Sequence, residues 1–487
     1  MRYLSTRGKG APVSAGNALL DGAAKDGGLY VPETLPDLSF LLEGKLTYQE
    51  LAAAVFEAFF PDFNRSDLIK ASESAYQTQF DHEDVTPLVP VGDCFILELF
   101  HGPTCAFKDM ALQALPRFLG MARERLDPHS HYLVLTATSG DTGSAAMRGF
   151  LNVPGFSVLV YYPEHGVSAV QKAQMTRMPG DNVKAVGILG NFDDAQAGVK
   201  AAFQMNPDEL PDGLKLTSAN SINIGRLIPQ IVYYIHACRQ LKESGALMPG
   251  QAVDFVVPSG NFGDIFAGYL AKQAGMPVGK LVCASNRNSV LADFIKTGVY
   301  DSRRELYKTL SPSMDILVSS NLERLLYYAA EGDADKVSGL MRQLKEEGWY
   351  KADADMMARI RADFNAAFAD DGQALEAIRE VFYKHHYLMD PHTATAFLAK
   401  DVLKGRDNPC VVLSTASPFK FPKAIFKALD HDLPEDGHEQ LKALSELTGV
   451  PVPPALESVM GLPEKTIKAI KRDEVVADVK RRAQTWS

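Results

Sequence analysis

The sequence predicts an α/β protein built on parallel β-sheets with helices on both faces. From His131 onward, short apolar runs rich in β-branched residues alternate with segments of helical periodicity, which is typical of doubly wound sheets. Small polar or glycine-rich turns follow several of these runs, and ligands bind at such turns. A chain of 487 residues is long enough for two or three domains.

The composition is that of an ordinary folded protein, with 46% hydrophobic and 23% charged residues. The formal net charge is -10 and basic runs are few, so the electrostatics of a nucleic-acid-binding protein are missing. No apolar run approaches the roughly 18 residues that cross a bilayer, and no apolar leader follows Met1. We therefore expect a cytoplasmic protein with neither nucleic acid nor membrane as a partner.

The cysteines are five and scattered along the chain: Cys94, Cys105, Cys238, Cys283 and Cys410. An odd number at irregular spacing argues against a disulfide framework and against a clustered metal site. We expect reduced thiols and no bound metal.

Residues 1–92 are expected to form an N-terminal cap domain. They contain helical patterns, as in residues 47–60, and lack the strand–helix alternation that follows. The segment 131–220 has four strand-like runs, each followed by a helical pattern: 131–138, 156–163, 182–189 and 214–218. We expect these runs to pair in parallel sheets covered by helices on both faces.

A second set of strand-like runs follows at 253–258 and 281–286. A charged helical section from about 300 to 386 then interrupts the alternation, which resumes with an apolar run at 410–416. We expect this late strand to rejoin an earlier sheet. Residues 93–430 therefore comprise two interleaved α/β domains, and residues 431–487 form a C-terminal helical extension.

The turn Val256–Asp264 joins a buried-strand pattern to the start of a helix. Gly260 and Gly263 let the backbone approach a ligand closely, and the free amides of a helix start favour a phosphate. The alternative is a tight turn capped by Ser259. Neither a Walker A motif nor GxGxxG is present, which argues against a nucleotide.

Two further strand-to-helix turns carry small polar residues. In Leu135–Ala146, Thr138, Ser139 and Thr142 form a set of donors suited to a carboxylate. In Val411–Phe421, Ser414 and Thr415 close the resumed strand. Helix capping alone would account for either turn.

The junction Leu216–Leu227 concentrates neutral hydrogen-bonding side chains and one arginine before a strongly apolar helix: Ser218, Asn220, Ser221, Asn223 and Arg226. Such groups are costly to bury without partners, and a polar ligand would supply them. The alternative is an exposed loop rich in Asx turns.

Lys108 lies between a turn-forming Gly102–Thr104 segment and a helical pattern, among apolar neighbours. A lysine in a partly apolar pocket has a lowered pKa and forms a Schiff base with an aldehyde, the usual attachment of pyridoxal phosphate. Most lysines are instead solvated surface residues. The phosphate turn and the carboxylate-sized turn favour the cofactor interpretation.

Five motifs occur in the order of a known family: "FHGPTCAFKDMALQ", "LTATSGDTGSAA", "SANSINIGRL", "VPSGNFGDIFAGYLAK" and "TASPFKF". Together with the N-terminal "GGLYVPETLP", they resemble the threonine synthases of the longer bacterial and fungal type. These are pyridoxal-phosphate enzymes of fold type II, which is similar to the tryptophan synthase β subunit. The resemblance covers residues 1–430 and implies that residues 93–430 are the catalytic region, with the cofactor between two doubly wound α/β domains.

The resemblance also implies roles for individual residues. Lys108 would bind the cofactor covalently and then act as the base at the substrate Cα. Thr415 would lie beside the pyridine nitrogen. The phosphate of the cofactor would be held by the turn of Gly260, Asn261, Phe262 and Asp264. Ser139, Asp141 and Thr142 would face the substrate carboxylate and the 3′ oxygen of the cofactor.

The reaction implied is the conversion of O-phospho-L-homoserine and water to L-threonine and phosphate, by a monomer or homodimer. The junction of Ser218, Asn220, Ser221, Asn223 and Arg226 is the candidate site for the leaving phosphate. Many relatives have Thr-Ala-His-Pro where this chain has Ser417, so no role for that imidazole carries over. A serine or threonine dehydratase of the same fold, a homologue that binds without turnover and a nucleotide-binding module are the alternatives.

Overall fold

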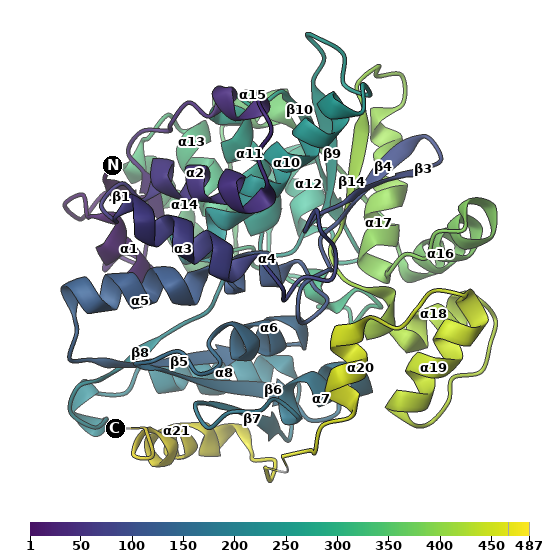
Figure 1. The fold of residues 1–487 in the computed structure, drawn as a ribbon. Helices are drawn as coiled ribbons and strands as arrows, with labels where there is room; N and C mark the ends of the chain where they lie inside the picture. Colours follow the sequence, from purple (N-terminus) through teal and green to yellow (C-terminus); the bar gives the residue numbers. More distant parts are fainter. Residues whose placement is uncertain (466, 487) are drawn as a thin grey trace.

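The computed structural model describes residues 1–465 and 467–486. It contains two main β-sheets, which lie in the upper and lower halves of the molecule in Figure 1. Among the described residues, no helix is long and apolar enough to span a membrane.

The smaller sheet is fully parallel and has the strand order β7-β6-β5-β8. Its strands are β5 (His131–Ala137), β6 (Phe156–Pro163), β7 (Val183–Ile188) and β8 (Leu214–Thr217). All four lie in the segment 131–220, and the parallel pairing predicted for these runs is confirmed. Strand β6 is buried along its whole length, as expected for a strand covered on both faces.

The larger sheet has the order β13-β10-β9-β14-β4-β3. Its strands are β3 (Leu88–Val91), β4 (Cys94–Glu98), β9 (Val253–Pro258), β10 (Val278–Ser285), β13 (Phe364–Phe368) and β14 (Cys410–Ser414). Only the β3–β4 pair is antiparallel. The late strand β14 inserts between β9 and β4, which confirms that it rejoins an earlier sheet.

Two sequence-based expectations need correction. The boundary expected at residue 92 lies in the hairpin between β3 and β4, so β3 belongs to the larger sheet and not to the cap domain. Strand β13 lies inside the section expected to be helical, because a five-residue edge strand between charged helices has too little periodicity to identify.

The N-terminal part packs helices against the rest of the chain. Strands β1 (Tyr3–Ser5) and β2 (Tyr30–Pro32) pair antiparallel. Its helices are α1 (Ala15–Asp21), α2 (Tyr48–Phe59) and α3 (Arg65–Ala75). Helix α2 begins with a capping box of Thr47 and Glu50 and buries Leu51, Val55 and Phe56 in the main core, as its three- and four-residue spacing predicts.

The remaining helices surround the sheets, and they are α4 (Lys108–Leu112), α5 (Leu115–Leu126), α6 (Asp141–Gly149), α7 (Ala169–Thr176), α8 (Phe192–Phe203), α9 (Ile224–Leu227), α10 (Pro229–Glu243), α11 (Gly263–Gln273), α12 (Val290–Thr297), α13 (Leu322–Ala329), α14 (Ala334–Glu347), α15 (Ala354–Asp363), α16 (Asp371–His385), α17 (Pro391–Ala399) and α18 (Pro422–Ala428). Strands β11 (Val299–Asp301) and β12 (Trp349–Lys351) form a small two-stranded antiparallel sheet, with α13 and α14 between them in the chain.

The C-terminal segment contains α19 (Gly437–Thr448), α20 (Pro454–Met460) and α21 (Val475–Ala483). It runs back along the smaller sheet (Figure 1), where Ile470 forms a parallel bridge with Ile188. Val475 and Val479 of α21 complete the core beneath β5 and β6. The expected extension 431–487 therefore packs on both domains, since α19 and α20 bury Leu444 and Leu456 in a cluster with Ile96 of the larger sheet; residues 466 and 487 lie outside the described part.

Candidate active site

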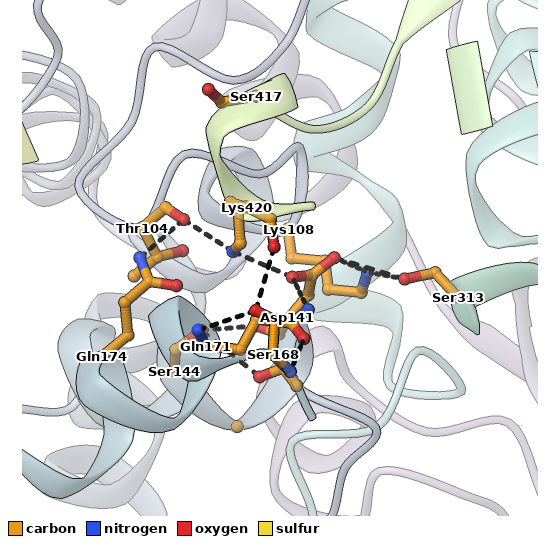
Figure 2. A network of polar contacts seen from close by, with 12 residues as sticks. Thr104, Lys108, Asp141, Ser144, Ser168, Gln171, Gln174, Ser313, Ser417 and Lys420 are labelled. Atoms are coloured by element: carbon orange, nitrogen blue, oxygen red, sulfur yellow. Dashed lines mark hydrogen bonds and ion pairs between the residues drawn. The ribbon is translucent and has the colours of Figure 1, made fainter. Parts of the chain in front are cut away.

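Lys108 begins α4, and its amine lies between the two sheet domains. The side chain is 11% exposed, and Nζ lies 3.6 Å from Asp141 Oδ2 and 3.4 Å from Ser313 Oγ (Figure 2). Burial lowers the pKa of Lys108; Asp141 opposes this shift, whereas the nearby charges of Lys420 and Arg226 add to it. A lysine with a lowered pKa supplies the free amine that attacks a carbonyl carbon.

Backbone pairing between two distant segments places Lys108 in the site. Phe107 N–H donates to the Thr415 carbonyl at 2.8 Å, Ser417 N–H donates to the Cys105 carbonyl at 3.0 Å, and Ala106 bridges Ala416. The residues before α4 therefore run antiparallel to those after β14. This pairing brings the predicted residues Lys108 and Thr415 together, although about 300 residues separate them in the sequence.

Asp141 begins α6 at the carboxyl end of β5 and forms a buried ion pair with Lys420. The distance from Lys420 Nζ to Asp141 Oδ1 is 2.8 Å, and the side chains are 0% and 3% exposed. Gln171 also donates to Oδ1, at 2.9 Å. Burial alone would raise the pKa of Asp141, but Lys420 and Lys108 hold it well below its usual range. Asp141 therefore carries a full negative charge beside Lys108.

Lys420 is anchored at both ends. Its Nζ donates to the Thr104 carbonyl at 2.7 Å, and its own carbonyl accepts a hydrogen bond from Ser168 Oγ at 2.9 Å. The Thr104 carbonyl also accepts from Gln174. In Figure 2, Lys420, Lys108 and Gln171 lie around Asp141, and Thr104 lies beside Lys420 and Gln174. They join the two domains through polar contacts.

The turn after β9, where the sequence predicts a phosphate site, is a tight turn that leads directly into α11. Phe262 adopts φ +64°, in the left-handed region, directly before α11. A Cβ on Gly260 would lie 2.5 Å from the Ser313 carbonyl oxygen, so only glycine fits there. The first amides of α11 have no partner within the helix and are available to an anion.

Asp264 differs from the other residues predicted in this turn. Its Oδ1 accepts hydrogen bonds from Tyr233 at 2.5 Å and Tyr234 at 2.9 Å. Burial raises the pKa of Asp264 to about 6, although these hydrogen bonds lower it. A carboxylate would repel a phosphate, so its backbone amide is the group suited to this role.

Arg226 lies in α9 with a 3% exposed side chain. Nη1 donates to the Ala219 carbonyl at 2.5 Å, and Nε is buried without a hydrogen-bond partner. Among residues 1–465 and 467–486, no carboxylate forms an ion pair with it. A buried guanidinium that lacks a counter-charge near Lys108 is a candidate group for binding an anion.

The other polar residues of this junction differ in role: some lie near the site, and others hold the backbone in place. Asn223 caps α9 through Gly225 N–H and donates to the Leu19 carbonyl, so both ends of its amide bind backbone groups. Ser221 accepts a hydrogen bond from Asn321 and lies beside Gly263 of the phosphate turn. Ser218 accepts from the amide of Asn220, whose side chain is exposed. Asn223 is thus a structural residue.

The turn after β5 is held by Thr138, whose Oγ1 accepts from Gly140 and Gly143 at 3.0 Å each. Ser139 and Thr142 are half-buried on this turn and flank Asp141. Gly140 has φ +137°, and a Cβ there would lie 2.5 Å from Gln171. The three predicted residues Ser139, Asp141 and Thr142 therefore occupy one turn at the edge of the site.

Sequence reasoning missed Lys420 and Ser313. Lys420 stands in the "TASPFKF" motif, so its proximity to Thr415 was the available signal. Ser313 lies in the charged helical section and has no sequence signal. Ser417 points away from the Asp141 network in Figure 2, and its hydroxyl caps the turn after it by accepting from Phe419 N–H at 3.3 Å.

Comparison with protein families matches three successive regions of the chain. They are the threonine synthase N terminus over residues 2–76, a pyridoxal-phosphate dependent enzyme over 80–415 and the threonine synthase C-terminal family over 393–481. The threonine synthase of Pseudomonas aeruginosa is 43% identical over 88% of this chain and 90% of that protein. The chain belongs to the threonine synthase family.

Two further comparisons extend this family assignment. The human protein threonine synthase-like 1 is 39% identical over 89% of this chain, which spans 60% of that longer relative. The pyridoxal-phosphate-bound threonine synthase of Brucella melitensis has 36% identity and a TM-score of 0.88, covering 100% of this chain and 99% of that one. The predicted fold is thereby confirmed.

Pyridoxal phosphate is the cofactor of this threonine synthase family member, and the residues present fit it. Lys108 offers a buried amine with a lowered pKa, and the turn before α11 presents the first amides of a helix, which suit a phosphate. Thr415, which is 5% exposed, accepts a hydrogen bond at its carbonyl from the amide of Phe107, next to Lys108, and its side chain is neutral.

Proposed function

We propose that this protein converts O-phospho-L-homoserine and water to L-threonine and phosphate. The observation that carries the proposal is the grouping of Lys108, the glycine phosphate turn and the unpaired Arg226 in one buried site between the domains. Membership of the threonine synthase family supports the same activity. The protein acts in the cytoplasm as a monomer or homodimer.

Pyridoxal phosphate, when bound, supplies an electrophilic carbon for amines and an electron sink for carbanions. Lys108 would hold the cofactor, and its free amine would take and return protons at the substrate carbons. Asp141 stabilises the resulting ammonium of Lys108, because its carboxylate stays ionised 3.6 Å away. Thr415 would offer the pyridine nitrogen a neutral hydroxyl, whereas a carboxylate partner would favour its protonated form.

Two anionic ends of the substrate need separate sites. The turn of Ser139 and Thr142 offers hydroxyl and amide donors for the carboxylate. Arg226 offers a guanidinium for the γ-phosphate, and its buried Nε has no other hydrogen-bond partner. A serine or threonine dehydratase of the same fold needs the first site but has no phosphate to bind.

The assay supplies O-phospho-L-homoserine and measures threonine and phosphate together. We expect equimolar release of both, inhibition by inorganic phosphate, and no turnover by Lys108→Ala. Borohydride should bleach the visible band of the wild-type protein and label the peptide that contains Lys108.

The matched variant is Arg226→Met, which keeps a long side chain without the charge. It should raise KM and weaken phosphate inhibition, with the visible spectrum unchanged. Keto acid formed from threonine, with no reaction on phosphohomoserine, would assign the dehydratase activity instead.

A further inference from the structure

Ser313 lies against the amine of Lys108, although it belongs to a loop far away in sequence. It occupies the short turn Pro312–Met314. Its Oγ accepts a hydrogen bond from Lys108 Nζ at 3.4 Å and donates to Asp141 Oδ2 at 3.2 Å. Because Nζ and Oδ2 are 3.6 Å apart, the three polar atoms form a closed triangle (Figure 2).

A buried histidine holds the backbone of Ser313. The Ser313 N–H donates to His392 Nε2 at 3.2 Å, and His392 Nδ1 lies 2.5 Å from Asp390 Oδ2. Since Nε2 accepts a hydrogen bond, Nδ1 carries the hydrogen and donates it to Asp390. His392 and Asp390 are 1% and 0% exposed, so solvent does not compete for either group.

The other side of Ser313 contacts the phosphate turn. Its carbonyl oxygen occupies the space that a Cβ on Gly260 would fill, at 2.5 Å. Asp315, two residues later, accepts hydrogen bonds from Asn286, Asn288 and Thr309. The loop is therefore fixed at both ends, and the Ser313 hydroxyl is pre-organised.

We propose that Ser313 is a further catalytic residue, whose hydroxyl orients the amine of Lys108, and that His392 and Asp390 are positioning residues for it. The role in turnover rests on the proposed function. A lysine side chain has four flexible carbons, and a directed acceptor limits the directions in which Nζ points. Without the hydroxyl, Asp141 would draw Nζ toward itself, and the amine would be misaligned for attack.

The first test compares Ser313→Ala with Ser313→Thr, which keeps the hydroxyl. Ser313→Ala should lower kcat by about 10- to 100-fold, the size of effect that misplacing a reacting group produces, with KM changed by less than about threefold. The rate at which cofactor-stripped chain regains its visible band on mixing with pyridoxal phosphate should fall by a similar factor. Ser313→Thr should restore both rates.

The matched control is Ser311→Ala in the same loop, because Ser311 Oγ bonds to Asn286 and Thr309 and not to Lys108. It should lower the melting temperature and leave both rates unchanged. Equal losses in Ser311→Ala, unchanged rates in Ser313→Ala, or no rescue by Ser313→Thr would each overturn the role of Ser313. The rate of cofactor capture is measured without substrate. A protein that lacks the proposed activity would therefore still show whether Ser313 affects capture.

The second test concerns the positioning residue His392. His392→Gln keeps an acceptor but shifts it, so it should slow cofactor capture less than Ser313→Ala does. If His392 acts through Ser313, the double variant should be no slower than Ser313→Ala alone. Additive losses would show that His392 acts by another route.

Discussion

Lys420 and Asp141 form a buried ion pair beside Lys108. The side chain of Lys420 is 0% exposed, and that of Asp141 is 3% exposed. Burial of one such charge without the other is strongly unfavourable, because each has left water. The pair thus couples the stability of the domain contact to the electrostatics around Lys108.

Replacement of Lys420 by methionine should destabilise the fold by about 3 to 5 kcal/mol, the usual cost of breaking a buried pair. Urea unfolding measures this loss. Asp141→Asn in the Lys420→Met background should recover part of it, since the uncompensated charge is then gone. Lys423→Met, at an exposed position in the same segment, should have little effect, and an equal loss there would contradict a stabilising role for the buried pair.

At the level of secondary structure, most residues of the candidate site lie in the turns that follow strands. The turns after β5, β9 and β14 were all identified from the sequence, because a buried apolar run that ends in small polar residues is typical of a strand leading into a ligand-binding turn. In the tertiary structure, the turn before α11 also packs against the loop that contains Ser313. Gly260 allows this contact, since its missing Cβ makes room for the Ser313 carbonyl.

Gly260→Ala should therefore displace the Ser313 loop and disturb the cofactor site together. We expect faster loss of pyridoxal phosphate on dialysis and slower recapture, with a smaller change in the melting temperature of the cofactor-free chain. Gly10→Ala is the control, since no atom lies within 4 Å of its Cβ position. A fall in melting temperature that accounts for the whole loss of cofactor would indicate backbone strain alone.

At the scale of the whole molecule, Arg324 connects the N-terminal part to the site. Its side chain is fully buried; Nε donates to the Tyr30 carbonyl at 2.9 Å and Nη2 to the Ile222 carbonyl at 2.6 Å. It also bonds to Asn321, whose amide reaches the Asn261 carbonyl of the phosphate turn. One arginine thus joins β2, the junction before α9 and the cofactor turn.

Arg324→Met should loosen the N-terminal part and the phosphate turn at once. Each carbonyl left without a partner costs about 1 to 3 kcal/mol, so hydrogen exchange should accelerate in β2 and around Asn261. Arg342→Met, at a position nearer the surface in α14, is the control. Acceleration confined to β2 would show that the phosphate turn does not depend on this arginine.

The sequence by itself determined the alternation of strands and helices, the reactive lysine and the turns that surround it. These are local properties: periodicity reports burial over a few residues, and a lysine among apolar residues before a helix is visible in one short motif. Lys108, Thr415 and the turn at Gly260 could therefore be named from the sequence. The family resemblance added their roles.

Only the tertiary structure decided which of these residues meet and what surrounds them. Ser313, His392 and Lys420 reach the site from three segments whose local sequences resemble ordinary loops and helix starts. Their function depends on contacts between residues more than 100 positions apart, such as Lys108 with Ser313, and local periodicity carries no information about such pairs. Asn223 is the opposite case: the sequence predicts a site residue, but both ends of its amide bind backbone groups. Its side chain therefore stabilises the fold.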